Sequence, residues 1–411
     1  MSYTCAVTTR FLPLTHHTAT GVQLSDSTLR FITLKQHGDS VIPEKFAEVL
    51  VPADCLDNGK IVNKNKFISF LRNIRKAYKL EDIALVLASP QVQTFSVSAK
   101  AAGALYVKEA VEKTFALPAK DIAYDYNTVT GNESNTVFHV TAMPKSVSLD
   151  MVNAFKSAGM TVTTIESVGH ALARDLIAVH SHESVLIVNI DTAVTSLTFI
   201  VKGKVSHTVL FDFGDDMITK SLMEKLQVSE AEVQRLKKED GLIAQHSRIV
   251  FDILVDDCVA LVRHINDTYI AWHNEHSALP TIDGIYLTGA GSTLRGLGEY
   301  LSVGLHMPVK EGNVWTNCLS FDEHVPVLPQ PLAIRYGAAI GVNLLGGDTV
   351  NMLPHSHKKS LRRQHAARVS GKLFFSFVLG VAVGFAVAKI IAIPGVHTQI
   401  LDTLHKIRAQ W

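Results

Sequence analysis

A short glycine-rich stretch in the second half of the chain has residue types suited to binding a nucleotide. Residues 284–301 read GIYLTGAGSTLRGLGEYL, which predicts a buried strand, a loop with Gly289, Gly291 and Ser292, and an amphipathic helix. Glycines in such a loop let backbone N–H groups approach a phosphate at the start of a helix. Glycine turns serve close packing equally well, so this stretch alone leaves nucleotide binding open.

The histidines and cysteines do not indicate metal or disulfide chemistry. Among the 19 histidines, His16-His17 and His180-Ser181-His182 lack cysteine neighbours and ligand spacing, so we expect no metal site. The absence of a Cys-x-x-Cys pair favours reduced, buried thiols over a disulfide framework or a zinc ribbon. The four cysteines are Cys5, Cys55, Cys258 and Cys318.

Charge is balanced over the chain but concentrated near its C-terminal end. Lys plus Arg number 39 against 38 for Asp plus Glu, so we expect no nucleic-acid partner. The segment 355–372 is strongly basic and predicts contact with anionic membrane lipids. Its basic residues are Lys358, Lys359, Arg362, Arg363, Arg368 and Lys372.

Residues 373–393 predict one transmembrane helix. They read LFFSFVLGVAVGFAVAKIIAI, and about 21 residues at about 1.5 Å each span roughly 30 Å of hydrocarbon. The charged residue, Lys389, lies near the end, where its ammonium group reaches the interface. The basic flank places residues 1–372 in the cytoplasm, and nothing at the N-terminus resembles a secretory signal. We therefore expect a single-pass protein of the cytoplasmic membrane; a buried core helix is the alternative.

The globular part contains a repeated pattern. Residues 21–34 and 185–211 both predict an apolar strand, a turn and a second strand, and the second segment adds a third strand. Ser229 and Glu232 form a predicted capping box at the start of a later helix. The helix that Gly214 opens has a predicted apolar face of Met217, Ile218, Leu222 and Leu226. The repetition predicts a duplicated α/β fold.

A different pattern separates the two repeats. Strands are predicted at 92–97, 122–126 and 136–142, and helices at 106–115 and 146–158. Residues 93–160 therefore predict a small β-α-β-β-α insert.

These pieces, in this order over roughly residues 20–345, resemble the PilM family of actin-like type IV pilus assembly proteins, which are relatives of the FtsA family. The most specific stretches are residues 211–242 (FDFGDDMITKSLMEKLQVSEAEVQRLKKEDGL), the loop within 284–301, and residues 162–176 (VTTIESVGHALARDL). The resemblance implies a duplicated actin-like (ribonuclease H-like) fold with a small inserted subdomain, and ATP with Mg²⁺ as the ligand.

The resemblance also implies which residues would contact the nucleotide. They are Ser25, Asp26, Ser27, Asp191, Thr195, Gly214, Lys237, Gly289, Gly291 and Ser292.

Several residues depart from the family's pattern at this site. Gln23 stands where the family's first phosphate loop has its magnesium-side aspartate, and Asn189-Ile190-Asp191 replaces Asp-x-Gly in the second. Gln234 replaces an acid, and Asp215 stands where a second glycine is usual. Asp26 or Asp191 could compensate from a neighbouring position. Because phosphate transfer needs carboxylates that hold magnesium, we assign no catalytic residue and expect no ATP hydrolysis, while ATP binding stays open.

A short motif follows the actin-like part. Val350, Asn351, Met352, Leu353 and Pro354 resemble the N-terminus of the PilN family, a peptide that in the pilus system docks into a groove on PilM. Pro354 disfavours helix at Leu353, and three apolar side chains are available for contact. The resemblance leaves open whether this peptide docks within its own chain or onto a neighbouring copy. The alternative is that residues 350–354 are an ordinary linker.

The expected domain organisation has seven parts. They are a first actin-like subdomain (1–92), the insert (93–160), a return to the first subdomain (161–180), a second actin-like subdomain with its helical lobe (181–347), the PilN-like motif with a basic linker (348–372), the transmembrane helix (373–393) and a short extracytoplasmic tail (394–411).

The function that this organisation predicts is a membrane-tethered scaffold of the pilus assembly platform, linking cytoplasmic motor components to membrane components. The resemblance implies PilN-, PilO-, PilC- and PilB-like partners, besides membrane lipids and further copies of the chain. An ATP-hydrolysing switch and an FtsA-like cell-division anchor are the alternatives.

Overall fold

The computed structural model describes residues 18–361 and 363, apart from 39, 100–102, 130–135, 277–278, 320–325 and 347–348. The chain divides into two compact units, of which the first ends at Pro354 and the second begins at His355. In the second unit, residues 355–361 are helical. No helix among the described residues is long and apolar enough to cross a membrane. The span predicted at 373–393 lies outside those residues.

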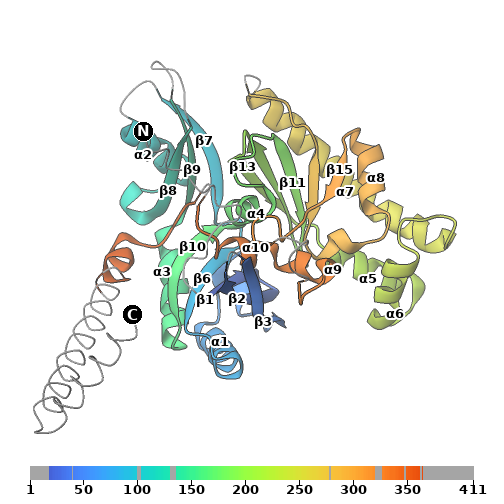
Figure 1. Cartoon of the computed structure of the whole chain (residues 1–411), viewed down its shortest axis with the longest axis horizontal. Coiled ribbons are helices and arrows are strands. Elements are labelled where there is room, and N and C mark those ends of the chain that lie inside the picture. Colours follow the sequence, from blue (N-terminus) through green and yellow to red (C-terminus); the bar gives the residue numbers. More distant parts are fainter. Residues whose placement is uncertain are drawn as a thin grey trace, which may run out of the picture. The chain divides into compact units, whose positions relative to one another are not determined.

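The first sheet of the larger unit has the strand order β10-β6-β1-β2-β3 (Figure 1). β1, β2 and β3 form an antiparallel meander, while β6 and β10 run parallel to β1 on its other side. Phe31, Ile32 and Leu34 are fully buried, as expected for a strand covered on both faces. The strands are β1 (Thr18–Leu24), β2 (Thr28–His37), β3 (Ser40–Leu50), β6 (Asp82–Leu87) and β10 (Thr161–Ser167). A hairpin of β4 (Leu56–Asp57) and β5 (Lys60–Ile61) follows β3.

The second sheet repeats this topology and then extends it. Its first five strands have the order β15-β14-β11-β12-β13, with the same antiparallel meander and the same two parallel neighbours. The strands are β11 (Val185–Ile190), β12 (Thr195–Val201), β13 (Lys204–Phe211), β14 (Ile285–Thr288) and β15 (Val309–Glu311). The duplicated α/β fold predicted from the repeated pattern is thus confirmed.

The predicted insert adds three strands to the second sheet, in the order β13-β7-β9-β8. The connection is narrow, because one residue pair, Thr208 with Thr94, joins β13 to β7. We call the part built around the first sheet the first lobe and the part built around β11–β15 the second lobe. α2 covers the three added strands, whereas α3 also contacts α1 and β10 of the first lobe. The elements are β7 (Gln93–Ala99), α2 (Gly103–Phe115), β8 (Ile122–Val129), β9 (Thr136–Pro144), α3 (Lys145–Ser157) and, in the first lobe, α1 (Lys64–Tyr78).

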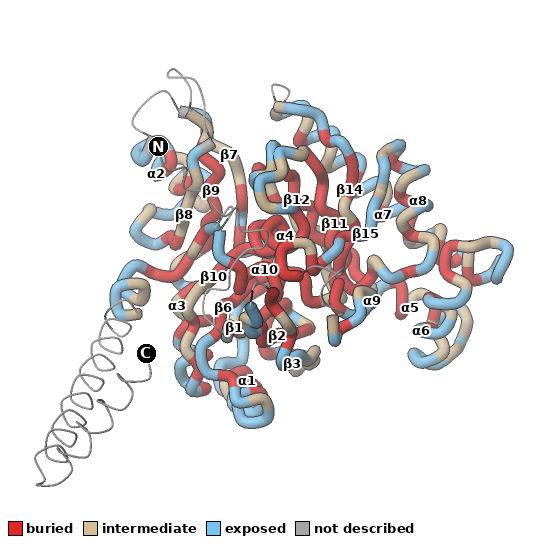
Figure 2. The backbone as a smooth tube through the Cα atoms, viewed as in Figure 1, coloured by how far each residue is buried: buried red, intermediate tan, exposed pale blue. Residues whose placement is uncertain are grey.

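Two helices at the centre of the larger unit, α4 (Val168–Leu176) and α10 (Gly337–Gly341), pack against each other and are buried along their lengths (Figure 2). They cross closely, since a Cβ added at Gly341 would lie 1.9 Å from the carbonyl oxygen of Ala171. Side chains from both sheets join one core around them, including Ile32, Val86 and Ile187.

The remaining helices lie in the second lobe. They are α5 (Asp215–Leu226), α6 (Glu230–Glu239), α7 (Arg248–Glu275), α8 (Leu297–Leu305) and α9 (Gln330–Ala333). Half of the predicted capping box at α6 is confirmed: the Ser229 side chain accepts a hydrogen bond from the Glu232 N–H, whereas the Glu232 carboxylate accepts from Arg235. The predicted apolar face of α5 is only partly right: Ile218 and Leu222 are buried, but Met217 is exposed because it lies on the opposite side of the helix.

Candidate functional site

The duplicated fold brings two equivalent turns together, one between β1 and β2 and one between β11 and β12. Direct contacts join them. Arg30 on β2 forms an ion pair with Asp191 and donates from Nη2 to Thr192 Oγ1 at 2.6 Å. Gln23 Nε2 donates to the other Asp191 carboxylate oxygen at 2.5 Å. The side chains of Arg30 and Asp191 are 1 % and 2 % exposed, so this contact is made away from water.

Two more charged residues complete this interlobe cluster, which we define as Gln23, Arg30, Glu48, Asp191 and Arg335. Arg30 Nε donates to Glu48 Oε2 at 2.8 Å, and Arg335 Nη2 donates to Glu48 Oε1 at 2.8 Å. Two guanidinium groups therefore balance two carboxylates, as a buried charge network requires.

The electrostatics of the interlobe cluster favour the charged forms of Arg30 and Glu48. Burial opposes the charge on Arg30, but the carboxylates of Asp191 and Glu48 outweigh it and raise the pKa of Arg30. Burial likewise raises the pKa of Glu48, and Arg30 and Arg335 more than reverse this, so that the pKa is lowered overall. Opposite charges at hydrogen-bond distance explain both directions.

The residues predicted for the first phosphate loop are mostly engaged within the protein. Ser25 Oγ accepts from the Thr28 N–H at 3.1 Å, and Asp26 Oδ1 accepts from the Gly59 N–H at 2.8 Å. Ser27 differs, because its buried hydroxyl has no hydrogen-bond partner among the described residues. Both carboxylate oxygens of Asp191 already accept hydrogen bonds, one from Gln23 and one from Arg30.

The predicted residues of the second lobe are engaged too. Lys237 is 6 % exposed, forms an ion pair with Asp215, and donates to Thr219 Oγ1 at 3.2 Å. Asp215, which stands where the family has a second glycine, thus neutralises the lysine that the family pattern retains. Thr195 Oγ1 donates to the Phe213 carbonyl at 2.7 Å.

The predicted glycines permit close packing of the chain on itself. A Cβ on Gly214 would lie 2.2 Å from the Thr192 carbonyl oxygen. Gly289 has φ of +91°, and its Cβ would lie 2.4 Å from the Ile190 carbonyl oxygen, while that of Gly291 would lie 2.5 Å from Ile190 Cγ2. These glycines keep the loop after β14 against the end of β11.

The 350–354 segment packs against the rest of the larger unit and is neither helix nor strand. The Met352 N–H donates to the Ile165 carbonyl at 2.8 Å, and its own carbonyl accepts from Ser148 Oγ at 2.9 Å. The Asn351 N–H donates to Asp125 Oδ2 at 3.1 Å. Val350, Met352 and Leu353 are 2 %, 0 % and 3 % exposed. The segment is thus held by backbone hydrogen bonds and apolar burial, the two means by which extended peptides dock.

Of the predicted lipid-contacting residues, the structure describes three. Lys359 and Arg363 are exposed and Lys358 is half-buried. Arg362, Arg368 and Lys372 lie outside the described residues. No group of three or more His, Cys, Asp and Glu side chains suited to a metal ion occurs in the described part of the chain.

Sequence reasoning missed Arg30, Glu48 and Arg335 as members of the site. A signal existed for Arg30, because a cation within the otherwise buried stretch TLRFITL requires a partner. Its partners could not be read from the sequence, since Asp191 is 161 residues away.

Comparison of the sequence with models of protein families identifies the family of this chain. The model described as "Type IV pilus assembly protein PilM" matches residues 21–344. The chain belongs to the PilM family. The expected family resemblance is therefore confirmed.

One solved structure agrees with membership of the PilM family at the level of the fold, and two others are more distantly similar. A PilM–PilN type IV pilus biogenesis complex is 15 % identical over 79 % of this chain and 97 % of that chain, with a TM-score of 0.63. EutJ from Carboxydothermus hydrogenoformans is 15 % identical over 82 % of this chain and 92 % of that chain, with a TM-score of 0.47. MreB5 of Spiroplasma citri bound to AMPPNP is 14 % identical over 74 % of this chain and 94 % of that chain, with a TM-score of 0.43. No curated protein matches the chain.

Proposed function

We propose that this PilM-family chain is a non-catalytic, membrane-tethered scaffold of the type IV pilus assembly platform, linking cytoplasmic motor components to membrane components. The interlobe cluster carries the proposal. In an actin-like switch the two turns hold phosphates and magnesium between them. Here the Arg30 guanidinium already bridges them, so the lobes are joined without a ligand.

The interlobe cluster also leaves few unpaired charged groups that could bind ATP. A phosphate chain at the two turns would have to displace Arg30 from Asp191, leaving a buried carboxylate beside a polyanion. Lys237 is neutralised by Asp215. Both features support the view that holding position, rather than nucleotide turnover, is the function.

Isothermal titration calorimetry on the full chain in detergent, with ATP and Mg²⁺, tests this part of the proposal. We expect no saturable heat and no phosphate release. An Asp191→Asn variant keeps the side-chain volume but removes the charge that holds Arg30, and serves as a comparison. Binding followed by turnover in the unaltered chain would contradict the scaffold and favour an ATP-hydrolysing switch.

The second part of the proposal concerns the tether. The 350–354 segment resembles the PilN N-terminus, is buried on the actin-like body of its own chain, and is followed by the basic segment and the predicted span. We propose that one polypeptide here joins two parts that are otherwise separate proteins, so that docking proceeds at high effective concentration.

Co-purification tests the cellular assignment. The tagged chain, isolated from solubilised membranes, should recover pilus-platform and motor proteins of the PilN, PilO, PilC and PilB types. Recovery of none of them, with the chain located at the division ring, would favour an FtsA-like anchor instead.

A further inference from the structure

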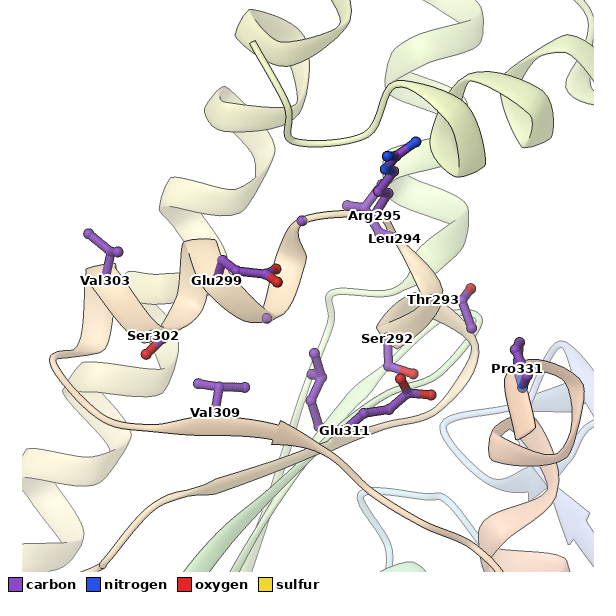
Figure 3. A pocket seen from close by; sticks show the side chains of 13 residues that line it. Ser292, Thr293, Leu294, Arg295, Glu299, Ser302, Val303, Val309, Glu311 and Pro331 are labelled. Carbon is purple, nitrogen blue, oxygen red and sulfur yellow. The ribbon is translucent and has the colours of Figure 1, made fainter. Parts of the chain in front are cut away.

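A pocket of 650 Å³ lies in the second lobe, between α8, β15 and the loop that follows β14 (Figure 3). It is distinct from the interlobe cluster, because none of the five cluster residues lines it. Of the residues predicted for nucleotide contact, it includes Ser292 but neither Lys237 nor Thr195. A volume of several hundred Å³ is typical of sites for small ligands.

The hydroxyl groups of the pocket already donate their protons within the protein. Ser292 donates to the Gly289 carbonyl at 2.7 Å, Thr293 to the Ala290 carbonyl at 3.0 Å, and Ser302 to the Met307 carbonyl at 2.8 Å. These oxygens can therefore offer a ligand lone pairs only.

The one cationic side chain of the lining is directed elsewhere. Arg295 donates from Nη1 to the Glu239 carbonyl at 2.8 Å, and in Figure 3 its guanidinium points away from Glu299 and Glu311. The pocket thus lacks a side-chain cation that could neutralise its acidic groups.

Two carboxylates supply the charge of the pocket. Glu299 comes from α8 and Glu311 from the end of β15. Both side chains are exposed, and neither carboxylate has a hydrogen bond or ion pair with a residue that the structure describes. Val303 and Val309 add apolar surface to the lining, and Val303 is 75 % exposed. An anionic ligand would be repelled here, whereas a cation on an apolar stem matches both kinds of wall.

We propose that this pocket binds an alkylammonium or alkylguanidinium group, with Glu299 and Glu311 accepting its N–H donors and the valines packing along its stem. Guanidinium and ammonium groups carry only donors, which complements a lining whose side-chain donors are used. The group can belong to a free polyamine or to a lysine or arginine of a protein segment, of which the basic residues 355–372 in another copy of the chain are one example.

Titration calorimetry of the full chain in detergent at low salt tests this site with three probes: agmatine, spermidine and a synthetic peptide of residues 355–372. We expect saturable binding of at least one probe, weakened about tenfold or more in a Glu299→Gln/Glu311→Gln double variant, because charge-assisted hydrogen bonds are lost. The control Glu109→Gln, at an exposed position of α2, should bind as the unaltered chain does. Melting temperatures confirm that all variants fold.

The ranking of the probes identifies the source of the cation. Tighter binding of spermidine or agmatine than of the peptide supports a free polyamine, and the reverse supports a basic protein segment. No saturable binding of any probe, or equal affinity in the double variant and the unaltered chain, would overturn the proposal.

Discussion

At the scale of single residues, the interlobe cluster shows how charged side chains from both lobes balance one another. Arg30 pairs with both Asp191 and Glu48, Arg335 pairs with Glu48, and Gln23 donates to Asp191. The ion pairs are therefore coupled through Arg30, whose loss would leave Asp191 as an unpaired buried charge.

Replacing Arg30 by alanine tests that coupling. We expect the free energy of unfolding to fall by about 3–5 kcal/mol, because Asp191 is left buried without its cation. A double variant, Arg30→Met with Asp191→Asn, should recover much of the loss, since both charges are removed together. Chemical denaturation measures both. Arg235→Ala, which breaks an exposed ion pair on α6, is the control and should change little. Equal stability of the Arg30→Ala chain would mean that the ion pair is not formed in solution.

The ionisation of Glu48 should make the free energy of unfolding depend on pH. Its pKa is lowered in the folded protein from an ordinary value of 4.5, so the unfolded chain takes up the proton first as the pH falls. The contribution of Glu48 to stability is then fully present above about pH 4.5 and is lost below it, as the pH falls through the folded-state pKa. Denaturation curves of the unaltered chain and Glu48→Gln should accordingly converge below about pH 4.5. A constant difference down to lower pH would contradict the assignment.

At the scale of elements, the 350–354 segment is connected to the central helices through polar contacts. Glu166 on β10 accepts from the Val350 N–H at 3.3 Å and from Arg174 Nη1 on α4 at 2.6 Å. Arg174 Nε in turn donates to the Gly341 carbonyl on α10 at 3.0 Å. These contacts link the 350–354 segment to the place where α4 and α10 cross.

A charge placed inside the docked segment tests its packing. Met352→Asp puts a carboxylate at a position that is 0 % exposed, and we expect the segment to detach from the body, because an unpaired charge is not tolerated there. Limited proteolysis and hydrogen exchange around residues 345–355 should show faster cleavage and exchange. Thr349→Asp, at a neighbouring exposed position, is the matched control. Identical protection in the two variants would show that the segment does not dock in solution.

At the scale of the whole molecule, the proposed scaffold depends on attachment to the membrane. Deleting residues 373–393 should move the chain from the membrane fraction to the soluble fraction, because roughly 30 Å of apolar helix is removed. The intact chain should resist extraction by alkaline carbonate. As a control, neutralising Lys358 and Lys359 should weaken only the lipid contact and leave the chain in the membrane fraction. A deleted chain that still pellets with membranes would argue against the span.

Much of the fold followed from local patterns in the sequence. The apolar strands at 21–34 and 185–211, the capped helix after Ser229 and the glycine loop at 289–292 are each specified by residues close together in the chain. Periodicity and capping act over a few residues, so a single sequence is enough to predict them. The order of these pieces also indicated the family, which the family model confirms.

The character of the site depended on contacts that only the tertiary structure supplies. Asp191 was predicted as a ligand of the nucleotide, yet its partner is Arg30, brought to it by the apposition of two duplicated lobes. Lys237 was predicted likewise and is paired with Asp215 on a different helix. Residue types at each turn determine which charges are available, whereas the packing of the lobes decides which charges neutralise one another. A carboxylate such as Asp191 could bind either magnesium or an arginine, and in this chain the fold places Arg30 beside it.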